Sequence, residues 1–188
     1  VGSPSPAAAD SPPAVTAGST APYGALPVQL TSFVGRERDL ATARSLLLRP
    51  NVRLLTLTGP PGTGKTRLAL ELAAGADRAA VVVELEHAAA DTPDTVTGAL
   101  AGALGVGVES GTGLVAACGR VLEVEPHLLV LDDCDRVTGA SAELVRALLA
   151  RVPDLVVLAT SRSPLGAADE TIYPLDPLPV AGGSTDDA

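Results

Sequence analysis

The sequence has 188 residues, of which 46% are hydrophobic, and its formal net charge is −9. This length suits one domain of ordinary size with flanking tails, and the hydrophobic share is sufficient for a substantial core. One Phe, two Tyr, no Trp and an acidic balance leave neither a basic face nor aromatic stacking platforms, so the composition argues against direct nucleic-acid binding by this segment.

Two other classes are disfavoured as well. No apolar run approaches the roughly 18 residues of a membrane span. The first residues also lack the basic and then apolar pattern of a signal peptide, so we expect a cytoplasmic protein without membrane contact. Cys118 and Cys134 have neither metal-ligand spacing nor a disulfide framework, which favours a pair of reduced thiols.

The chain begins with residues 1–27, which contain six prolines, one charged residue and no apolar periodicity. Such a segment cannot bury enough surface to offset its ordering entropy, so it is predicted to be a disordered linker. Residues 179–188 are predicted to be a similar tail, or the start of a linker to a helical subdomain. One compact unit is expected at 28–178, and the first residue, Val in a linker, indicates a piece of a longer protein.

Short apolar runs alternate with helical patterns through this unit. Strands are predicted at 53–58, 81–85, 128–132, 155–160 and 171–175, and helices at 36–48, 66–74, 94–104, 114–124 and 141–152. The strands are continuous Val and Leu runs, which indicates that both faces of the sheet are covered. The alternation predicts an α/β fold with a five-stranded, mostly parallel sheet and helices on both faces.

Phe33, Val34, Gly35 and Arg36 come directly before the first predicted helix. Their composition indicates an apolar pair, a flexible glycine and a charged helix start. Taken alone, these residues are a helix entry in which Phe33 anchors the core, and the residue types by themselves indicate no particular chemistry.

The first predicted strand is followed by the G-x-x-x-x-G-K-[ST] spacing of a phosphate-binding loop, with Lys65, the only lysine of the chain, at its lysine position. The glycines let backbone N–H groups turn toward phosphate oxygens, and the next helix adds its N-terminal dipole. Lys65 would reach the β- and γ-phosphates, and the Thr66 hydroxyl would bind Mg²⁺. The candidate nucleotide-binding residues are Gly59, Pro60, Gly62, Thr63, Gly64, Lys65, Thr66 and Arg67. A chance glycine-rich turn is the alternative, and the strand and helix around the loop argue against it.

The third predicted strand ends in Asp132 and Asp133. Parallel strands in one sheet would place these carboxylates beside the phosphate loop. Asp132 is the candidate Mg²⁺ ligand, directly or through water, and Asp133 the candidate that orients or deprotonates an attacking water. The alternative is a strand that simply ends in two solvated carboxylates.

The fourth predicted strand is followed by Ser161 and Arg162. At this position they could approach a γ-phosphate, where an arginine distinguishes a triphosphate from a diphosphate by its charge. The alternative is a solvent-exposed arginine that opens the loop at 163–166.

Four blocks in this order resemble the NB-ARC-like ATPase domain of STAND-class signalling regulators. The blocks are LTSFVGRE at 30–37, LTLTGPPGTGKTRLA at 55–69, LLVLDDC at 128–134 and LATSRSPLG at 158–166. The similarity is greatest to multidomain bacterial transcriptional regulators of the antibiotic-regulatory or large LuxR type. This resemblance implies a P-loop NTPase fold of the ASCE or AAA-like kind with strand order 5-1-4-3-2. It also implies ATP or ADP and Mg²⁺ as ligands.

The resemblance also implies specific roles and partners. Val34, Gly35 and Arg36 would contact the adenine and ribose, and Arg162 would sense the γ-phosphate. A DNA-binding module and helical repeats would lie elsewhere in the polypeptide, and an ATP-dependent homo-oligomer is implied too. Asp133 departs from the pattern, since many relatives carry Asn there, and the region from Glu86 to Val108 lacks the expected aromatic residues. The chain also stops before the helical and winged-helix subdomains that normally close over the nucleotide.

We interpret the chain as a regulatory ATPase module that binds Mg·ATP, hydrolyses it slowly and converts nucleotide state into a conformational signal. Lys65, Asp133 and Arg162 are its candidate catalytic residues. One alternative is a nucleotide-binding interaction module without turnover. Another is an AAA-type DNA-processing ATPase, which would form rings and respond to polynucleotides, and which the acidic charge disfavours.

Overall fold

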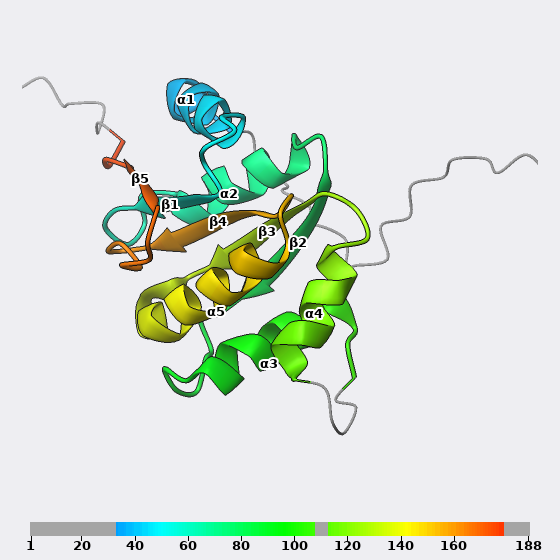
Figure 1. Ribbon diagram of the computed structural model, residues 1–188. Helices are drawn as coiled ribbons and strands as arrows, with labels where there is room; N and C mark the ends of the chain where they lie inside the picture. The colour runs from blue at the N-terminus through cyan, green and yellow to red at the C-terminus, as the bar shows by residue number, and fades with distance from the viewer. Residues whose placement is uncertain (1–32, 108–112, 179–188) are drawn as a thin grey trace, which may run out of the picture.

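The computed structural model describes residues 33–107 and 113–178, and the statements below concern these residues. They form a five-stranded sheet with helices on both faces (Figure 1). The linker predicted at 1–27 and the tail predicted at 179–188 lie outside the described residues. The domain boundaries at 28 and 178 therefore stay predictions.

The five strands pair in the order β2-β3-β4-β1-β5, and all four pairings are parallel. Their bounds are Leu54–Thr58 for β1, Ala79–Glu84 for β2, His127–Asp132 for β3, Val156–Ser161 for β4 and Thr171–Pro174 for β5. This order is the predicted 5-1-4-3-2 read from the other edge, so the predicted fold is confirmed.

The helices divide between the two faces of the sheet. Their bounds are Glu37–Leu47 for α1, Lys65–Ala74 for α2, Pro93–Leu104 for α3, Leu114–Leu122 for α4 and Thr138–Arg151 for α5. Helices α1 and α2 cover one face, and α3, α4 and α5 cover the other (Figure 1). None of the helices in the described residues has both the length and the apolar character needed to cross a membrane.

Strand β3 shows why the buried strands have no polar alternation. Leu129 and Leu131 pack into the core under α3, α4 and α5, whereas Leu128 and Val130 pack into the core under α1 and α2. All four side chains are buried. A parallel strand between two helical layers needs an apolar side chain at each position, and this produces the continuous Leu and Val runs in the sequence.

Contacts that are distant in sequence determine where α5 begins and ends. Asp91, in the loop before α3, accepts a hydrogen bond from the backbone N–H of Ala140 at 2.8 Å. At the other end, Arg53 donates to the carbonyl oxygens of Leu149 and Val152 at 2.9 and 2.5 Å. Helix α5 therefore starts at Thr138, before the predicted residue 141, and a short 3₁₀ turn at Cys134–Arg136 comes before it.

The parallel register brings the carboxyl ends of four strands together. Thr58 of β1 lies opposite Ser161 of β4, and Glu84 of β2 lies opposite Asp132 of β3. Loops that follow parallel strands meet at this edge, which is where open α/β sheets bind ligands. The predicted phosphate loop, acid pair and arginine all lie at this edge or directly after it.

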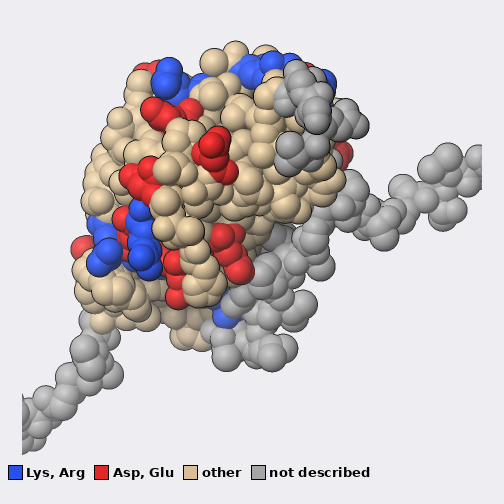
Figure 2. Space-filling model, turned by 90° about the horizontal axis from the view of Figure 1, so that it is seen from below, with Lys and Arg blue, Asp and Glu red and all other residues tan. Residues whose placement is uncertain are grey.

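Charges of both signs are interspersed on the surface. On the face seen in Figure 2, Lys and Arg side chains occur in separate groups among Asp and Glu.

Candidate functional site

The loop between β1 and α2 has backbone geometry that glycine alone adopts easily. Gly64 is the N-cap of α2 with φ of 89°, and no side chain caps that helix end. Gly59 has φ of 151°, and a Cβ there would collide with the carbonyl oxygen of Leu175. The backbone N–H groups at the start of α2 are thus left for an anion, which the dipole of the helix also favours.

Two backbone carbonyl groups of this loop hold the side-chain ammonium of Lys65. Its Nζ donates to the carbonyl oxygens of Gly59 and Pro60 at 2.8 and 3.0 Å. The Thr63 side chain also stays inside the loop, because its Oγ1 donates to the Pro60 carbonyl at 3.0 Å. The ammonium therefore lies at the mouth of the loop, whereas the Thr63 hydroxyl braces the loop from within.

One carboxylate oxygen joins the loop to two strand ends. Asp132 Oδ1 accepts hydrogen bonds from Thr66 Oγ1 at 2.8 Å and from Thr160 Oγ1 at 2.6 Å. The predicted pair of Thr66 and Asp132 is thus brought together across 66 residues of sequence. Thr160 was missed by the sequence analysis, although it comes directly before Ser161, and it also accepts a hydrogen bond from the Asp133 backbone N–H at 2.9 Å.

Asp133 has an unusual backbone and an unusual proton affinity. Its φ is 58°, in the left-handed region that Asp and Asn tolerate better than most residues. Burial raises the pKa of its carboxyl above the ordinary value, and the nearby carboxylates of Asp135, Asp132 and Glu86 raise it further. A carboxylate with a raised pKa is a better proton acceptor at neutral pH, which suits a general base.

Asp135 organises the loop after β4 and was not predicted from the sequence. Its Oδ1 accepts from Ser161 Oγ at 3.0 Å and from the Arg162 backbone N–H, and its Oδ2 pairs with Arg162 Nε at 2.7 Å. Burial raises the pKa of Asp135, but these hydrogen bonds and the charge of Arg162 lower it more, so the pKa lies below the ordinary value. The only sequence signal for it is a third acid close behind Asp132 and Asp133.

These residues surround a cleft of about 650 Å³. It is lined by Pro61, Gly62, Gly64, Lys65, Thr66, Arg67, Leu70, Glu84, Glu86, Asp132, Asp133, Asp135 and Thr160. The lining contains charges of both signs. Lys65 and Arg67 of α2 are its two cations, and the five carboxylates are Glu84, Glu86, Asp132, Asp133 and Asp135, at or shortly after the strand ends. Such a cleft can hold an anion against the loop if a cation offsets the carboxylates.

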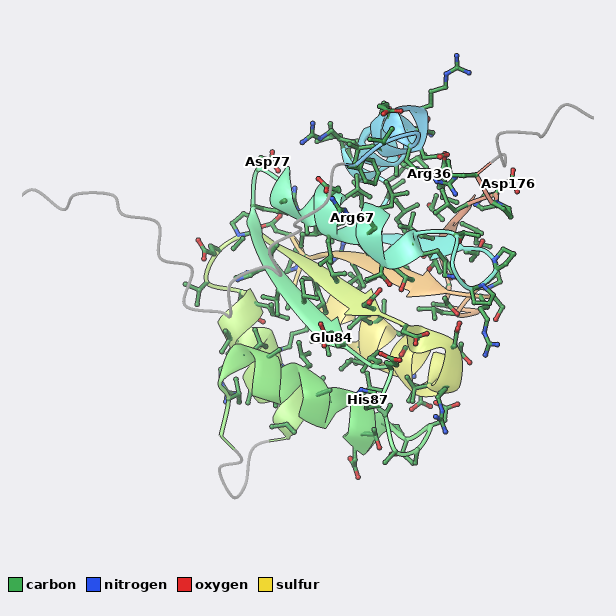
Figure 3. All side chains as sticks on the ribbon, turned by 180° about the vertical axis from the view of Figure 1, so that it is seen from behind. Arg36, Arg67, Asp77, Glu84, His87 and Asp176 are labelled. Carbon is green, nitrogen blue, oxygen red and sulfur yellow. The ribbon has the colours of Figure 1, made fainter. Side chains whose placement is uncertain are left out.

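Arg36 lies behind the phosphate loop and contacts the protein backbone. It is 8% exposed, and its guanidinium donates to the carbonyl oxygens of Thr63 at 2.8 Å and Asp176 at 2.5 Å, and to Asp39 Oδ2 at 3.0 Å. Figure 3 shows Arg36 and Asp176 side by side next to α1. Arg36 therefore ties the start of α1 to the loop and to the chain after β5.

Val34, Gly35 and Arg36 are not among the residues that line the cleft. Val34 is 70% exposed, and the Gly35 N–H donates to Glu37 Oε1 at 3.0 Å. Their assignment to the adenine and ribose stays a prediction. Phe33 is partly buried against the core under α1 and α2, as the simpler interpretation of this segment expected.

Replacing Arg36 by alanine is expected to lower the free energy of unfolding by about 2–3 kcal/mol, because three hydrogen bonds from a buried guanidinium are lost. Chemical denaturation would measure this. Arg38→Ala is the matched control, since Arg38 is exposed two residues further along α1. Equal unfolding midpoints for the two variants would show that the contacts of Arg36 contribute nothing to stability.

Arg67 lines the cleft, whereas Cys118, Cys134 and His87 are not among its lining residues. Arg67, labelled in Figure 3, pairs with Glu71 at 3.0 Å. Its guanidinium lies 5.9 Å from the centre of the Phe33 ring. Burial raises the pKa of the Cys134 thiol to about 12, and neither Cys134 nor Cys118 forms a disulfide. His87 is exposed after β2. No group of three or more His, Cys, Asp or Glu residues within 33–107 and 113–178 is arranged to hold a metal by itself.

Comparison with known proteins places this geometry among ATPases. Residues 50–163 match the model of a family described as AAA domain. Uncharacterized proteins of Mycobacterium bovis and Mycobacterium tuberculosis are 37% identical over 153 residues, which is 79% of this chain and 38% of theirs. Another Mycobacterium tuberculosis protein, provisionally named an HTH-type transcriptional regulator, is 35% identical over 121 residues, or 64% of this chain and 14% of its own length. This chain thus spans well under half the length of these curated relatives.

Solved structures share the fold at low sequence identity. A Signal Transduction ATPase with Numerous Domains from Pyrococcus horikoshii, which carries a tetratricopeptide repeat sensor, has a TM-score of 0.50 and 21% identity over 79% of this chain and 24% of its own. Cdc6p from Pyrobaculum aerophilum has a TM-score of 0.54 and 20% identity over 73% of this chain and 41% of its own. These likenesses concern the fold alone.

Proposed function

The chain belongs to the AAA domain family of P-loop ATPases, and from this premise we propose that it binds Mg·ATP in the cleft and serves as a nucleotide-dependent switch within a larger regulatory polypeptide. One observation carries the proposal. The hydroxyl of Thr66, next to Lys65, donates to Asp132 Oδ1 at 2.8 Å. This contact joins the phosphate loop to the acidic strand end, the two parts that an Mg·nucleotide site requires.

The residues present fit a magnesium ion that arrives with a nucleotide. Mg²⁺ prefers oxygen ligands and is held by few protein groups together with phosphates and waters. Thr66 would supply a hydroxyl and Asp132 a carboxylate, directly or through water. When bound, Mg²⁺ would neutralise charge on the phosphates. The five carboxylates of the cleft supply the negative charge that such an ion would offset.

The cleft also contains the group that hydrolysis would need. Asp133 has a carboxyl of raised pKa that lines the cleft. It would orient a water molecule and take its proton as the water oxygen attacks the γ-phosphorus and the bond to the ADP oxygen breaks. Lys65 would stabilise the charge on the β- and γ-phosphates during this step. Because the role is regulatory, turnover would be slow.

Switching requires a group that distinguishes ATP from ADP. Arg162 would do so by contacting the γ-phosphate, because a ligand shifts a conformational equilibrium only by its differential affinity for the two states. The regulatory context is supported by the relative named for HTH-type transcriptional regulation and by the multidomain STAND protein of similar fold. We accordingly assign the domain to an NB-ARC-like, cytoplasmic regulator whose other domains include a DNA-binding module and helical repeats, with ATP-dependent self-association.

The proposal is tested on the full polypeptide purified from its host. Denaturation is expected to release ATP or ADP close to one per chain, and calorimetric titration of the nucleotide-free protein with Mg·ATP is expected to give saturable binding. Removing Mg²⁺ with EDTA should weaken ATP binding by at least about tenfold, because the carboxylates would then oppose the phosphates without a counter-ion. Absence of bound nucleotide together with absence of binding heat would overturn the proposed function.

A further inference from the structure

The ion pair between Asp135 and Arg162 bears on how the site discriminates between nucleotides. Asp135 Oδ2 lies 2.7 Å from Arg162 Nε, and its other oxygen accepts from Ser161 Oγ and from the Arg162 backbone N–H. A single carboxylate therefore binds the side chain of the last residue of β4 and two groups of the residue that follows it. That carboxylate comes from the 3₁₀ turn after β3, so the pair links two strand ends.

The two partners differ in their relation to the cleft. Asp135 lines the cleft, whereas Arg162 is not among its lining residues, and the Arg162 side chain is 60% exposed. The ion pair with Asp135 therefore connects the arginine to the lining of the cleft. An arginine that moved to a phosphate in the cleft would have to give up the Nε contact with Asp135 or share it.

We propose that Asp135 is a positioning residue that competes with the γ-phosphate for Arg162, and that it thereby limits the preference of the site for ATP over ADP. This inference rests on the proposed function, because it requires Arg162 to be the group that recognises the γ-phosphate. The carboxylate acts through the guanidinium, which it holds in an ion pair that a γ-phosphate would have to break or share. ADP has no γ-phosphate, so its binding is affected less.

The experiment measures dissociation constants for Mg·ADP and for a Mg²⁺ complex of a non-hydrolysable ATP analogue, in the full polypeptide. Asp135→Asn removes the charge but keeps an oxygen that accepts from Ser161 and the Arg162 N–H. It is expected to tighten analogue binding about fivefold, the scale of a partly exposed ion pair, and to change ADP binding less than about twofold. Thermal unfolding checks that the variant is folded. If it is not, Asp135→Ser removes the charge with a smaller acceptor and permits the same comparison.

Two controls separate competition for Arg162 from simple loss of charge. Glu86 lines the same cleft, and no hydrogen bond or ion pair joins it to Arg162 among the described residues, so Glu86→Gln should change binding of both nucleotides by similar factors. In an Arg162→Ala background, Asp135→Asn should no longer change the ratio of the two constants, as a double-mutant cycle requires.

The outcomes are distinct. An unchanged or reduced preference for the ATP analogue in Asp135→Asn would overturn the inference, and so would an equal shift in Glu86→Gln or a shift that persists without Arg162. A wild-type protein that binds neither nucleotide would instead overturn the proposed function, and this inference with it.

Discussion

Lys65→Ala is expected to weaken Mg·ATP binding by about tenfold to a hundredfold, the contribution of one or two hydrogen bonds to charged groups. Lys65 Nζ already lies over the loop, bonded to the carbonyl oxygens of Gly59 and Pro60. A short rearrangement would let it reach a phosphate that replaces these neutral acceptors. Calorimetry or displacement of a fluorescent nucleotide would measure the loss.

The fold of this variant should remain intact. The side chain is only half-buried, so the two carbonyl oxygens that lose it can bind water instead. The melting temperature is therefore expected to change by less than about 4 °C, as for a loss below 1 kcal/mol. Arg146→Ala is the control, because it removes an exposed cation of α5 that does not line the cleft. An unfolded Lys65→Ala protein, or unchanged ATP affinity, would contradict the proposed role.

Asp133→Asn is expected to reduce ATP hydrolysis by at least about a hundredfold, the lower range for loss of a general base, while ATP binding changes little. The amide keeps the shape of the carboxyl but cannot take a proton from water. Asn also tolerates the left-handed backbone at this position, where φ is 58°. Phosphate release and nucleotide binding, measured on the same preparations, would separate the two effects.

Asp169→Asn is a matched control for this variant. Among the described residues other than glycine, Asp133 and Asp169 have a positive φ, which is 59° at Asp169. Asp169 is exposed and does not line the cleft. The control should hydrolyse ATP at the wild-type rate. Turnover that is absent from the wild type as well would favour the alternative of a binding module without hydrolysis. Turnover that survives in Asp133→Asn would assign the base elsewhere.

The sheet was predictable because its strands are buried on both faces. Leu128, Leu129, Val130 and Leu131 have no polar interruption, and a run of that kind between helical patterns fits only a strand inside a parallel sheet. The strand order did not follow from these runs; the resemblance to the P-loop NTPase fold implied it. The start of α5 was predicted three residues late, because its first turn is held by Asp91, which lies 49 residues before Ala140 in the sequence.

For the candidate site, too, some features followed from the sequence and others only from the tertiary structure. The sequence by itself determined which chemical groups are available at the carboxyl edge of the sheet. A phosphate loop, a strand-end acid pair and an arginine are local patterns, and parallel pairing must bring their strand ends to one edge. The contact of Thr66 with Asp132 agrees with that expectation.

Only the tertiary structure decided which partner each of these groups takes. Arg36, expected at the adenine and ribose, is buried against the Thr63 and Asp176 carbonyls, and Arg162, expected at the γ-phosphate, is paired with Asp135. Neither pairing follows from spacing, because several acceptors of similar strength lie within reach of a long side chain. Packing and strand register select among them, and these depend on the whole chain.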